Sequence, residues 1–325
     1  MRSFVQSARS RLLAVVGIAA VLLAVIPTSP ALATYPGTTG RIAFGSDRPA
    51  VFTGGGAHNI FTMNPNGTDV QQLTFFTVDT GAALNPSWSP DGSRLVFERR
   101  PADHSFRDIY MMNADGSNQH VLLSDPGFQD FNPKFSPDGS KVIFQRCRSD
   151  FEACAIYTVK SDGHGLTAIT HIDVKHNVYD QIPEYSPGGK TIAFTSFNRG
   201  GVQAAIYLMD AHGSNLRRLT PTGLEAFGPD WSPDGTELLM LAPCCTAEHT
   251  AIWKVHPDGS GLTQLTLPGA EYDYTAAFSP QGDQITFERD SADFSTSSIL
   301  TMNSDGGPPT TIQADAFAPS WGSAP

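Results

Sequence analysis

Residues 87–93, Ser-Trp-Ser-Pro-Asp-Gly-Ser, form a phrase that occurs five times in the chain and decides its fold. The other copies are KFSPDGS from Lys134, EYSPGGK from Glu184, DWSPDGT from Asp230 and AFSPQGD from Ala277. Proline presets φ and glycine accepts positive φ, so each copy is typical of a turn. A catalytic site rarely occurs in five copies. We therefore interpret Ser89 as a turn residue whose hydroxyl bonds nearby backbone.

The phrase recurs at intervals of 47, 50, 46 and 47 residues, a period typical of propellers or solenoids. Each unit contains four short strand candidates: one that ends in an aromatic residue before the turn, then runs such as RLVFE, DIYMM and LRRLT. Asp-Gly or Asn-Gly hairpins separate the third and fourth candidates. The second candidates are apolar on both faces, which indicates sheets covered on both sides, as in stacked blades.

The two ends of the repeat array complement each other. RIAFGS from Arg41 is a second strand without a first, and FAPSWGS from Phe317 is a first strand without a second. The sequence therefore predicts an all-β, six-bladed β-propeller of four-stranded antiparallel blades, with the ring closed by the C-terminal strand. We expect a single domain over residues 34–325, in which residues 317–321 complete the first blade. The blades are expected to start near residues 41, 85, 132, 183, 229 and 276.

Residues 1–33 have the pattern of a signal peptide. Three arginines precede the apolar run 12–26, and Ala31-Leu32-Ala33 supplies the small residues of a cleavage site. That run is shorter than the roughly 20 residues a membrane-spanning helix needs. We expect cleavage after Ala33, no membrane insertion afterwards, and a protein that is secreted or held in the periplasm or cell envelope.

The charge balance excludes one class of partner. Residues 34–325 contain 18 basic and 32 acidic side chains, because residues 1–33 hold three arginines and no acid. Nucleic-acid binding needs clustered Lys and Arg, and these residues contain no basic run. The Asp-Gly hairpins also lack the spacing of a calcium-binding EF-hand loop. We expect a monomer whose partner is an extracellular or envelope protein, a peptide or a glycan.

Several phrases resemble the repeat of the TolB-type six-bladed propellers. They are WSPDG at Trp88 and Trp231, IYMMNADGS at Ile109 and RRLT at Arg217, within a likeness that covers about residues 40–322. The resemblance implies the propeller domain, without the separate domain that precedes the propeller in TolB itself. Prolyl oligopeptidase relatives join similar blades to a hydrolase domain, but no G-x-S-x-G motif occurs in this sequence.

Acidic residues recur three or four positions before the proline position of the first strand in five blades. We expect these acids and the aromatic residues beside them to encircle the mouth of the axial channel and to bind ligand. Converging carboxylates would have raised pKa values unless a metal cation, an amine or a basic peptide lay among them. The alternative is that each carboxylate accepts local hydrogen bonds and locks adjacent blades. The set is Asp130, Asp180, Glu225, Asp273, Asp315, Tyr272, Tyr274, Phe131 and Phe227.

The cysteines and histidines suggest few other sites. Cys147 and Cys154 flank six residues of one expected hairpin connection, so we predict a disulfide between them. A zinc site is disfavoured there because no histidine is near. The state of Cys244 and Cys245 stays open. The segment that contains His171, Asp173 and His176 has metal-ligand residue types but is also typical of an ordinary exposed loop.

Two functional hypotheses follow. The first is a non-catalytic binding module that uses the loop-rich face and the acidic channel mouth, with no required cofactor but room for a cation in the channel. The alternative is a metal-dependent hydrolase or lyase that uses the same channel. A propeller fold is compatible with both. The sequence favours the first, because it contains no evident pairing of nucleophile and base, and we assign no catalytic residue.

Overall fold

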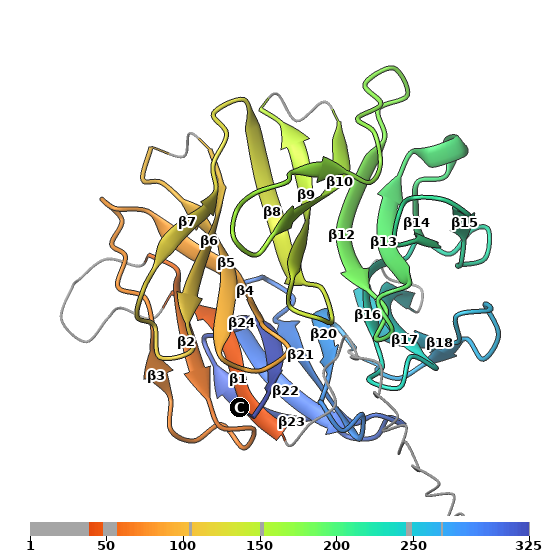
Figure 1. Ribbon diagram of the computed structural model, residues 1–325. Coiled ribbons are helices and arrows are strands. Elements are labelled where there is room, and N and C mark those ends of the chain that lie inside the picture. Colours follow the sequence, from red (N-terminus) through yellow and green to blue (C-terminus); the bar gives the residue numbers. More distant parts are fainter. Residues whose placement is uncertain are drawn as a thin grey trace, which may run out of the picture.

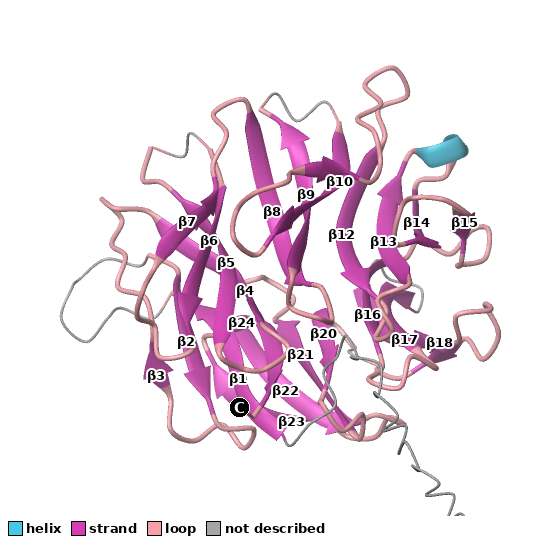
Figure 2. Ribbon diagram, in the orientation of Figure 1, coloured by secondary structure: helices cyan, strands magenta, loops and turns pink. Residues whose placement is uncertain are grey.

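The protein is described by a computed structural model over residues 39–47, 57–103, 106–149, 153–244, 249–267 and 269–324. These residues form 24 β-strands and one three-residue 3-10 helix, η1 (Arg199–Gly201), shown in Figure 2. The strands form six four-stranded antiparallel blades arranged in a ring (Figure 1). The all-β propeller that the sequence predicts is thereby confirmed. The expected signal peptide, residues 1–33, lies outside the described residues.

The first three blades are each built from four strands that follow one another outward from the axis. Blade 1 contains β24 (Phe317–Ser323), β1 (Thr39–Ser46), β2 (Asn59–Met63) and β3 (Gln71–Gln72). Blade 2 contains β4 (Ala82–Trp88), β5 (Arg94–Arg100), β6 (Asp108–Asn113) and β7 (His120–Leu123). Blade 3 contains β8 (Phe128–Phe135), β9 (Lys141–Arg148), β10 (Cys154–Lys160) and β11 (Thr167–Ala168).

The remaining blades repeat this order. Blade 4 contains β12 (Tyr179–Tyr185), β13 (Thr191–Phe197), β14 (Ala204–Asp210) and β15 (Arg217–Arg218). Blade 5 contains β16 (Phe227–Trp231), β17 (Leu238–Cys244), β18 (His249–Val255) and β19 (Thr263–Gln264). Blade 6 contains β20 (Tyr272–Phe278), β21 (Gln284–Asp290), β22 (Ser297–Asn303) and β23 (Thr310–Ala314). A single parallel pair, Cys154 with Tyr179, also joins blades 3 and 4.

The C-terminal strand closes the ring as predicted. β24 pairs antiparallel with β1, with Ile42 opposite Trp321 and Ala43 opposite Ser320. In Figure 1 the blue β24 accordingly lies beside the red β1. Blade 1 thus combines one strand from the C-terminal end of the chain with three strands from the N-terminal end. This pairing leaves no unpaired edge between the first and last blades.

The recurring turn is held by its own side chains. Ser89 Oγ donates to Asp91 Oδ1 at 2.6 Å and accepts the backbone N–H of Arg94 at 2.9 Å. The same bonds recur at Ser136 with Asp138 and at Ser232 with Asp234. Ser89 is therefore a turn residue, as the sequence indicates.

The hydrophobic core lies between the blades. One cluster joins Val96, Ile109 and Met111 of blade 2 to Phe135 and Phe144 of blade 3, and these five side chains are all buried. The second strands are buried on both faces because a blade packs on each side of them. No helix among the described residues is long and apolar enough to span a membrane.

Candidate functional site

Every first strand carries a bulge at the same position of the repeat. One residue of each strand has a positive φ, and the pairing with the second strand shifts register there. Five of the six are not glycine, and the left-handed conformation costs each of those about 1 kcal/mol or more. The residues are Asn85 (φ 48°), Asn132 (50°), Ile182 (50°), Gly228 (64°), Thr275 (44°) and Ala318 (49°).

Side chains of the preceding blade hold three of these bulges. Glu98 Oε1 accepts the backbone N–H of Asn132 at 2.8 Å, and Thr195 Oγ1 accepts that of Gly228 at 3.0 Å. Glu288 Oε2 accepts the N–H of Ala318 at 2.9 Å. Each acceptor lies on the second strand of one blade and each donor on the first strand of the next. These bonds fix the bulges and join neighbouring blades at the same time.

The bulges surround an axial cavity of about 230 Å³. First strands of all six blades contribute to its wall. Five of them place a proline directly after the bulge residue, so the wall is largely apolar and has few N–H donors. The prolines are Pro86, Pro133, Pro183, Pro229 and Pro319. Blade 6 has Ala276 at this position.

One end of the cavity narrows to a chamber of about 30 Å³ that contains three charged side chains. Lys134, Glu184 and Asp230 each follow the first-strand proline of their blade and belong to three successive blades. The chamber is large enough for about one water molecule. The axial cavity thus combines an apolar wall with a charged end.

The two carboxyl groups at this end behave as a pair. Glu184 hydrogen-bonds to Asp230, and Asp230 Oδ2 also accepts the backbone N–H of Phe278 at 2.9 Å. Burial raises the pKa of Glu184 well above its ordinary value and raises that of Asp230 to about 6, while the charge of Lys134 lowers both. Glu184 is 7% exposed, and its Oε2 has no hydrogen-bond partner among the described residues. Burial therefore favours the protonated form of this pair, and the charge of Lys134 opposes it.

The five acids predicted from the sequence lie elsewhere, because none of them lines the described wall of the cavity. Three are buried and form ion pairs with arginines of their own blade. Glu225 and Asp315 are exposed. The pairs are Asp130 with Arg146 (2.7 Å), Asp180 with Arg199 (2.5 Å) and Asp273 with Arg289 (2.6 Å).

The Asp130 pair is the most deeply buried of the three. Arg146 donates from Nε and Nη2 to both carboxylate oxygens, and the two side chains are 2% and 1% exposed. Burial raises the pKa of Asp130 to about 6, against the opposing effect of Arg146. This geometry gives the carboxylate a structural role within blade 3. A ligand-binding role for the five acids stays a prediction.

The predicted aromatic residues divide into two groups. Phe227 and Tyr274 line the cavity. Phe131 packs against Arg107, whose guanidinium carbon lies 4.8 Å from the centroid of the Phe131 ring. Tyr272 connects the cavity to the surface, because its ring is 6.3 Å from that of Tyr274 and 4.8 Å from that of Phe294. These three stacked rings form what we call the aromatic column.

Phe294 is a surface residue that the sequence analysis missed. It is 58% exposed and has a φ of 55°. Asp293 Oδ1 fixes its loop by accepting Oγ hydrogen bonds of 2.7 Å from Ser291 and Ser295. Hydrogen bonds from these serines lower the pKa of Asp293 to about 2. A rigid polar loop therefore presents an apolar ring beside the cavity.

The weak metal candidates form no complete ligand set. Asp173 accepts hydrogen bonds from the backbone N–H and the ring of His176, at 3.1 and 2.8 Å, and His171 is exposed. The hydrogen bonds from His176 lower the pKa of Asp173. Within the described ranges, no three His, Cys, Asp or Glu side chains are placed to hold a metal ion.

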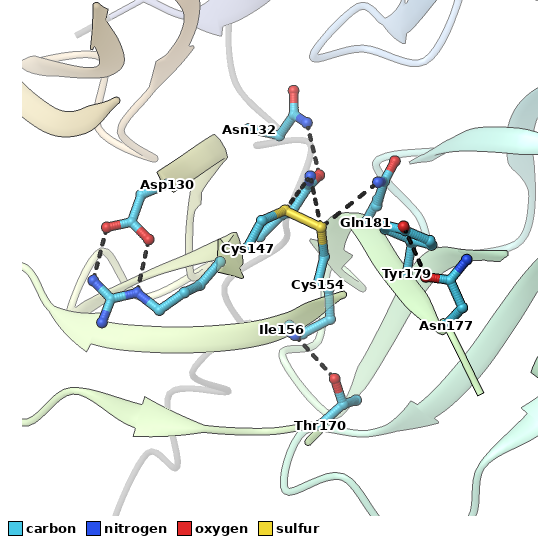
Figure 3. Close-up of a disulfide and its surroundings, with 11 residues drawn as sticks. Asp130, Asn132, Cys147, Cys154, Ile156, Thr170, Asn177, Tyr179 and Gln181 are labelled. Carbon is cyan, nitrogen blue, oxygen red and sulfur yellow. Dashed lines mark hydrogen bonds and ion pairs between the residues drawn. A yellow bond between two sulfur atoms is a disulfide. The ribbon is translucent and has the colours of Figure 1, made fainter. Parts of the chain in front are cut away.

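The predicted disulfide between Cys147 and Cys154 is confirmed. The two residues lie directly opposite each other on β9 and β10. Figure 3 shows the bridge between Asn132 on one side and Gln181 of blade 4 on the other, whose Nε2 is 3.9 Å from Cys154 Sγ. Cys244 is buried. Cys245 lies outside the described residues.

The fold and its axial cavity define a six-bladed propeller with a ligand-sized central site. The chain belongs to the TolB beta propeller domain family, whose model matches residues 124–324. Its resemblance to that family is therefore confirmed.

Relatives of known sequence or structure share parts of the chain. It is 41% identical over 58 residues to the uncharacterized peptidase YuxL of Bacillus subtilis, which is 18% of this chain and 9% of that protein. The chain spans at most about half the length of the curated relatives it matches. TolB from Acinetobacter baumannii superposes with a TM-score of 0.69 at 22% identity, over 87% of this chain and 67% of that one. The putative TolB from Agrobacterium tumefaciens gives 0.63 at 23% identity, over 86% and 90%.

Proposed function

We propose that the protein is a non-catalytic interaction module that binds a segment of a partner protein, or a peptide, in its axial cavity. The supporting observation is the cavity itself, which is ringed by six bulges, five of them at strained non-glycine residues, and ends at an incompletely satisfied carboxyl pair. Strained backbone persists where the surrounding structure over-determines it, and it concentrates at ligand sites. The propeller family to which the chain belongs supports the same function.

The chemistry of the cavity defines what the segment carries. Proline rings and the side chains of Phe227 and Tyr274 suit an apolar stretch in an extended conformation. An ammonium or guanidinium group beside Glu184 and Asp230 would favour their ionised forms, because an opposite charge stabilises carboxylates. We therefore propose a segment with apolar residues and one lysine or arginine. The aromatic column provides a further contact surface at the mouth.

We further propose that the protein works outside the cytoplasm as a monomer. Support comes from the signal-peptide pattern of residues 1–33 and from the Cys147–Cys154 disulfide, since disulfides persist in oxidising compartments. Intact-mass analysis of exported protein should give a chain that starts at Thr34. A full-length chain held in the membrane would contradict this assignment.

Site-specific photo-crosslinking tests the proposed site. A benzophenone amino acid replaces Tyr274 at the cavity or, as the matched control, Val121, which is 49% exposed on the outer strand β7. Both variants should melt within a few degrees of the wild type. In the cell envelope and medium of the producing organism, the Tyr274 variant should join to a partner that the Val121 variant does not capture. Equal capture at both positions, or capture at Val121 alone, would contradict binding in the cavity.

A metal-dependent hydrolase or lyase is the second candidate. It is favoured by the buried Glu184 and Asp230 pair, since carboxyl groups with raised pKa values serve as general acids and as metal ligands. The similarity to a protein named as a peptidase covers only 9% of that relative. Metal analysis of purified protein separates the two candidates. A stoichiometric transition metal that is lost from a Glu184→Gln variant would favour the enzyme.

A further inference from the structure

The recurring turn of blade 4 lacks the aspartate that organises it in other blades. Blades 2, 3 and 5 have Ser-Pro-Asp-Gly, in which the carboxylate accepts bonds from two neighbouring hydroxyl groups. Blade 4 has Ser186-Pro187-Gly188-Gly189. A Cβ placed on Gly188 would meet no atom within 4 Å, and its φ is outside the left-handed region. Neither space nor backbone conformation requires glycine at this position.

A cavity of about 400 Å³ lies beside this glycine, between blades 3 and 4. Its wall comes from the turn of blade 3, the turn of blade 4 and the hairpin of blade 4 that contains His212. These are the turn-bearing ends of the strands, opposite the loops that carry Phe294 and the aromatic column. The cavity is therefore distinct from the axial site. Its volume is within the ordinary range for small-molecule sites.

Tyr185 supplies a hydroxyl group to the wall of this cavity. In five blades the equivalent residue is tryptophan or phenylalanine, and blade 4 alone places a hydroxyl there. Tyr185 is 5% exposed, lines the cavity, and makes no hydrogen bond through its hydroxyl to any described residue. Burial raises the pKa of Tyr185 to about 12, so the hydroxyl stays neutral and can both donate and accept.

The other polar groups of the cavity carry both signs of charge. Lys141 is exposed and donates, and His212 is exposed on the opposite wall. Although burial opposes it, hydrogen bonds from Ser136 and Ser140 lower the pKa of Asp138, which is therefore ionised at neutral pH. Asp138 would repel an anionic ligand, and Lys141 would repel a cationic ligand. A neutral ligand rich in hydroxyl groups can satisfy both.

We propose that this inter-blade cavity binds one neutral sugar ring, with the Tyr185 hydroxyl as the hydrogen-bond partner of a ring hydroxyl. Pro137, Gly188 and Ala211 provide the apolar surface for the carbon face of the ring. Gly188 is required because the aspartate found in other blades would project into the ligand space. The proposal is independent of the function proposed for the axial cavity.

Two conservative variants test the site. Gly188→Asp introduces the carboxylate found at this turn in three other blades, so it should fold with an unchanged or higher melting temperature while it adds a charged side chain to the wall of the cavity. Tyr185→Phe keeps the ring and removes only the hydroxyl. The probes are the methyl glycosides of glucose, mannose, galactose and N-acetylglucosamine, with methyl glucuronide as an anionic control, measured by titration calorimetry and ligand-observed NMR.

We expect at least one neutral glycoside to bind the wild type, with affinity about tenfold lower in Tyr185→Phe and no measurable binding in Gly188→Asp. An Asp234→Gly variant, which removes the same carboxylate from blade 5, should bind as the wild type does. Failure of all four neutral glycosides to bind would overturn the proposal. Stronger binding of methyl glucuronide, or unchanged binding by Gly188→Asp, would overturn it equally.

Discussion

Glu288 holds the strand that closes the ring, because its Oε2 accepts a hydrogen bond of 2.9 Å from the backbone N–H of Ala318. Glu288 belongs to blade 6, and Ala318 is the bulge residue of β24, which completes blade 1. A single carboxylate thus connects the last blade, the closing strand and the wall of the axial cavity. The same bond between Glu98 and Asn132 shows that this is a device of the repeat.

Glu288 makes the closure sensitive to pH. Burial, together with the charge of Asp290 beside it, raises the pKa of Glu288 to about 7. The folded state binds this proton more tightly than the unfolded chain does, so its contribution to stability is present at acid pH and is lost as the pH rises through 7. Between pH 5 and 8 the wild type should lose about 2 kcal/mol relative to Glu288→Gln, as measured by urea unfolding. Parallel pH profiles for the two proteins would refute this assignment.

Removal of the closing strand should open the ring. A chain that lacks residues 316–325 leaves β1 without its hydrogen-bonding partner, which exposes an edge of blade 1. We expect aggregation or a large fall in melting temperature. A soluble, monomeric truncated protein that melts with the full chain would show that the closure contributes little.

The Asp130–Arg146 pair should stabilise blade 3 strongly. Among the described residues, only the guanidinium of Arg146 contacts both carboxylate oxygens of Asp130. Arg146→Met removes this group and leaves the negative charge of Asp130 uncompensated. The free energy of unfolding at pH 8 should fall by about 3–5 kcal/mol. Asp130→Asn in the same background should recover part of the loss, because it removes the unpaired charge. Urea titrations of the wild type and the two variants measure both effects.

The disulfide should contribute modestly to the free energy of unfolding. Cys147 and Cys154 are separated by seven positions in sequence, so the bridge restricts a short loop of the unfolded chain. Replacement of both by serine should cost about 2 kcal/mol, without loss of the folded state. Peptide mapping without reductant that finds either residue joined to Cys244 or Cys245 would contradict the pairing.

The repeat made most of the fold predictable from the sequence. Turn residues at a constant spacing located the strands, and the unmatched strands at Arg41 and Phe317 indicated the closure. The disulfide was also predictable, because Cys147 and Cys154 flank one hairpin connection. In each of these cases the local sequence signal and the tertiary fold agree on the structure that the residues adopt.

The residues of the axial cavity were harder to predict, because the repeat draws attention to residues that recur in kind. Acids such as Asp130 and Asp273 recur in register, but their arginine partners lie 16 residues further along the chain, on the adjacent strand. The charged residues of the cavity do not recur in kind: Lys134, Glu184 and Asp230 occupy one repeat position with different chemistry. A polar residue between a proline and a buried aromatic residue was the signal that could have identified them.

The bulges were not predictable at all. A residue before proline ordinarily adopts an extended conformation, and nothing in the letters of Ile182-Pro183 indicates a φ of 50°. This conformation is imposed by the closed ring and by the hydrogen bonds from neighbouring blades. Tertiary structure therefore determines the shape of the cavity wall.

The most direct test of the axial site is the affinity of a synthetic peptide that covers the crosslinked partner segment. It should be titrated at several salt concentrations into the wild type and two double variants. Glu184→Gln with Asp230→Asn changes the acids of the cavity, and Asp180→Asn with Asp273→Asn changes two other first-strand acids, which form ion pairs outside it. With folding verified by melting temperature, the cavity variant should bind at least about tenfold more weakly and with less dependence on salt, and the control should bind as the wild type does. Unchanged affinity in the cavity variant, together with weaker binding by the control variant, would contradict binding in the axial cavity. It would instead place the binding site at the acids of the channel mouth.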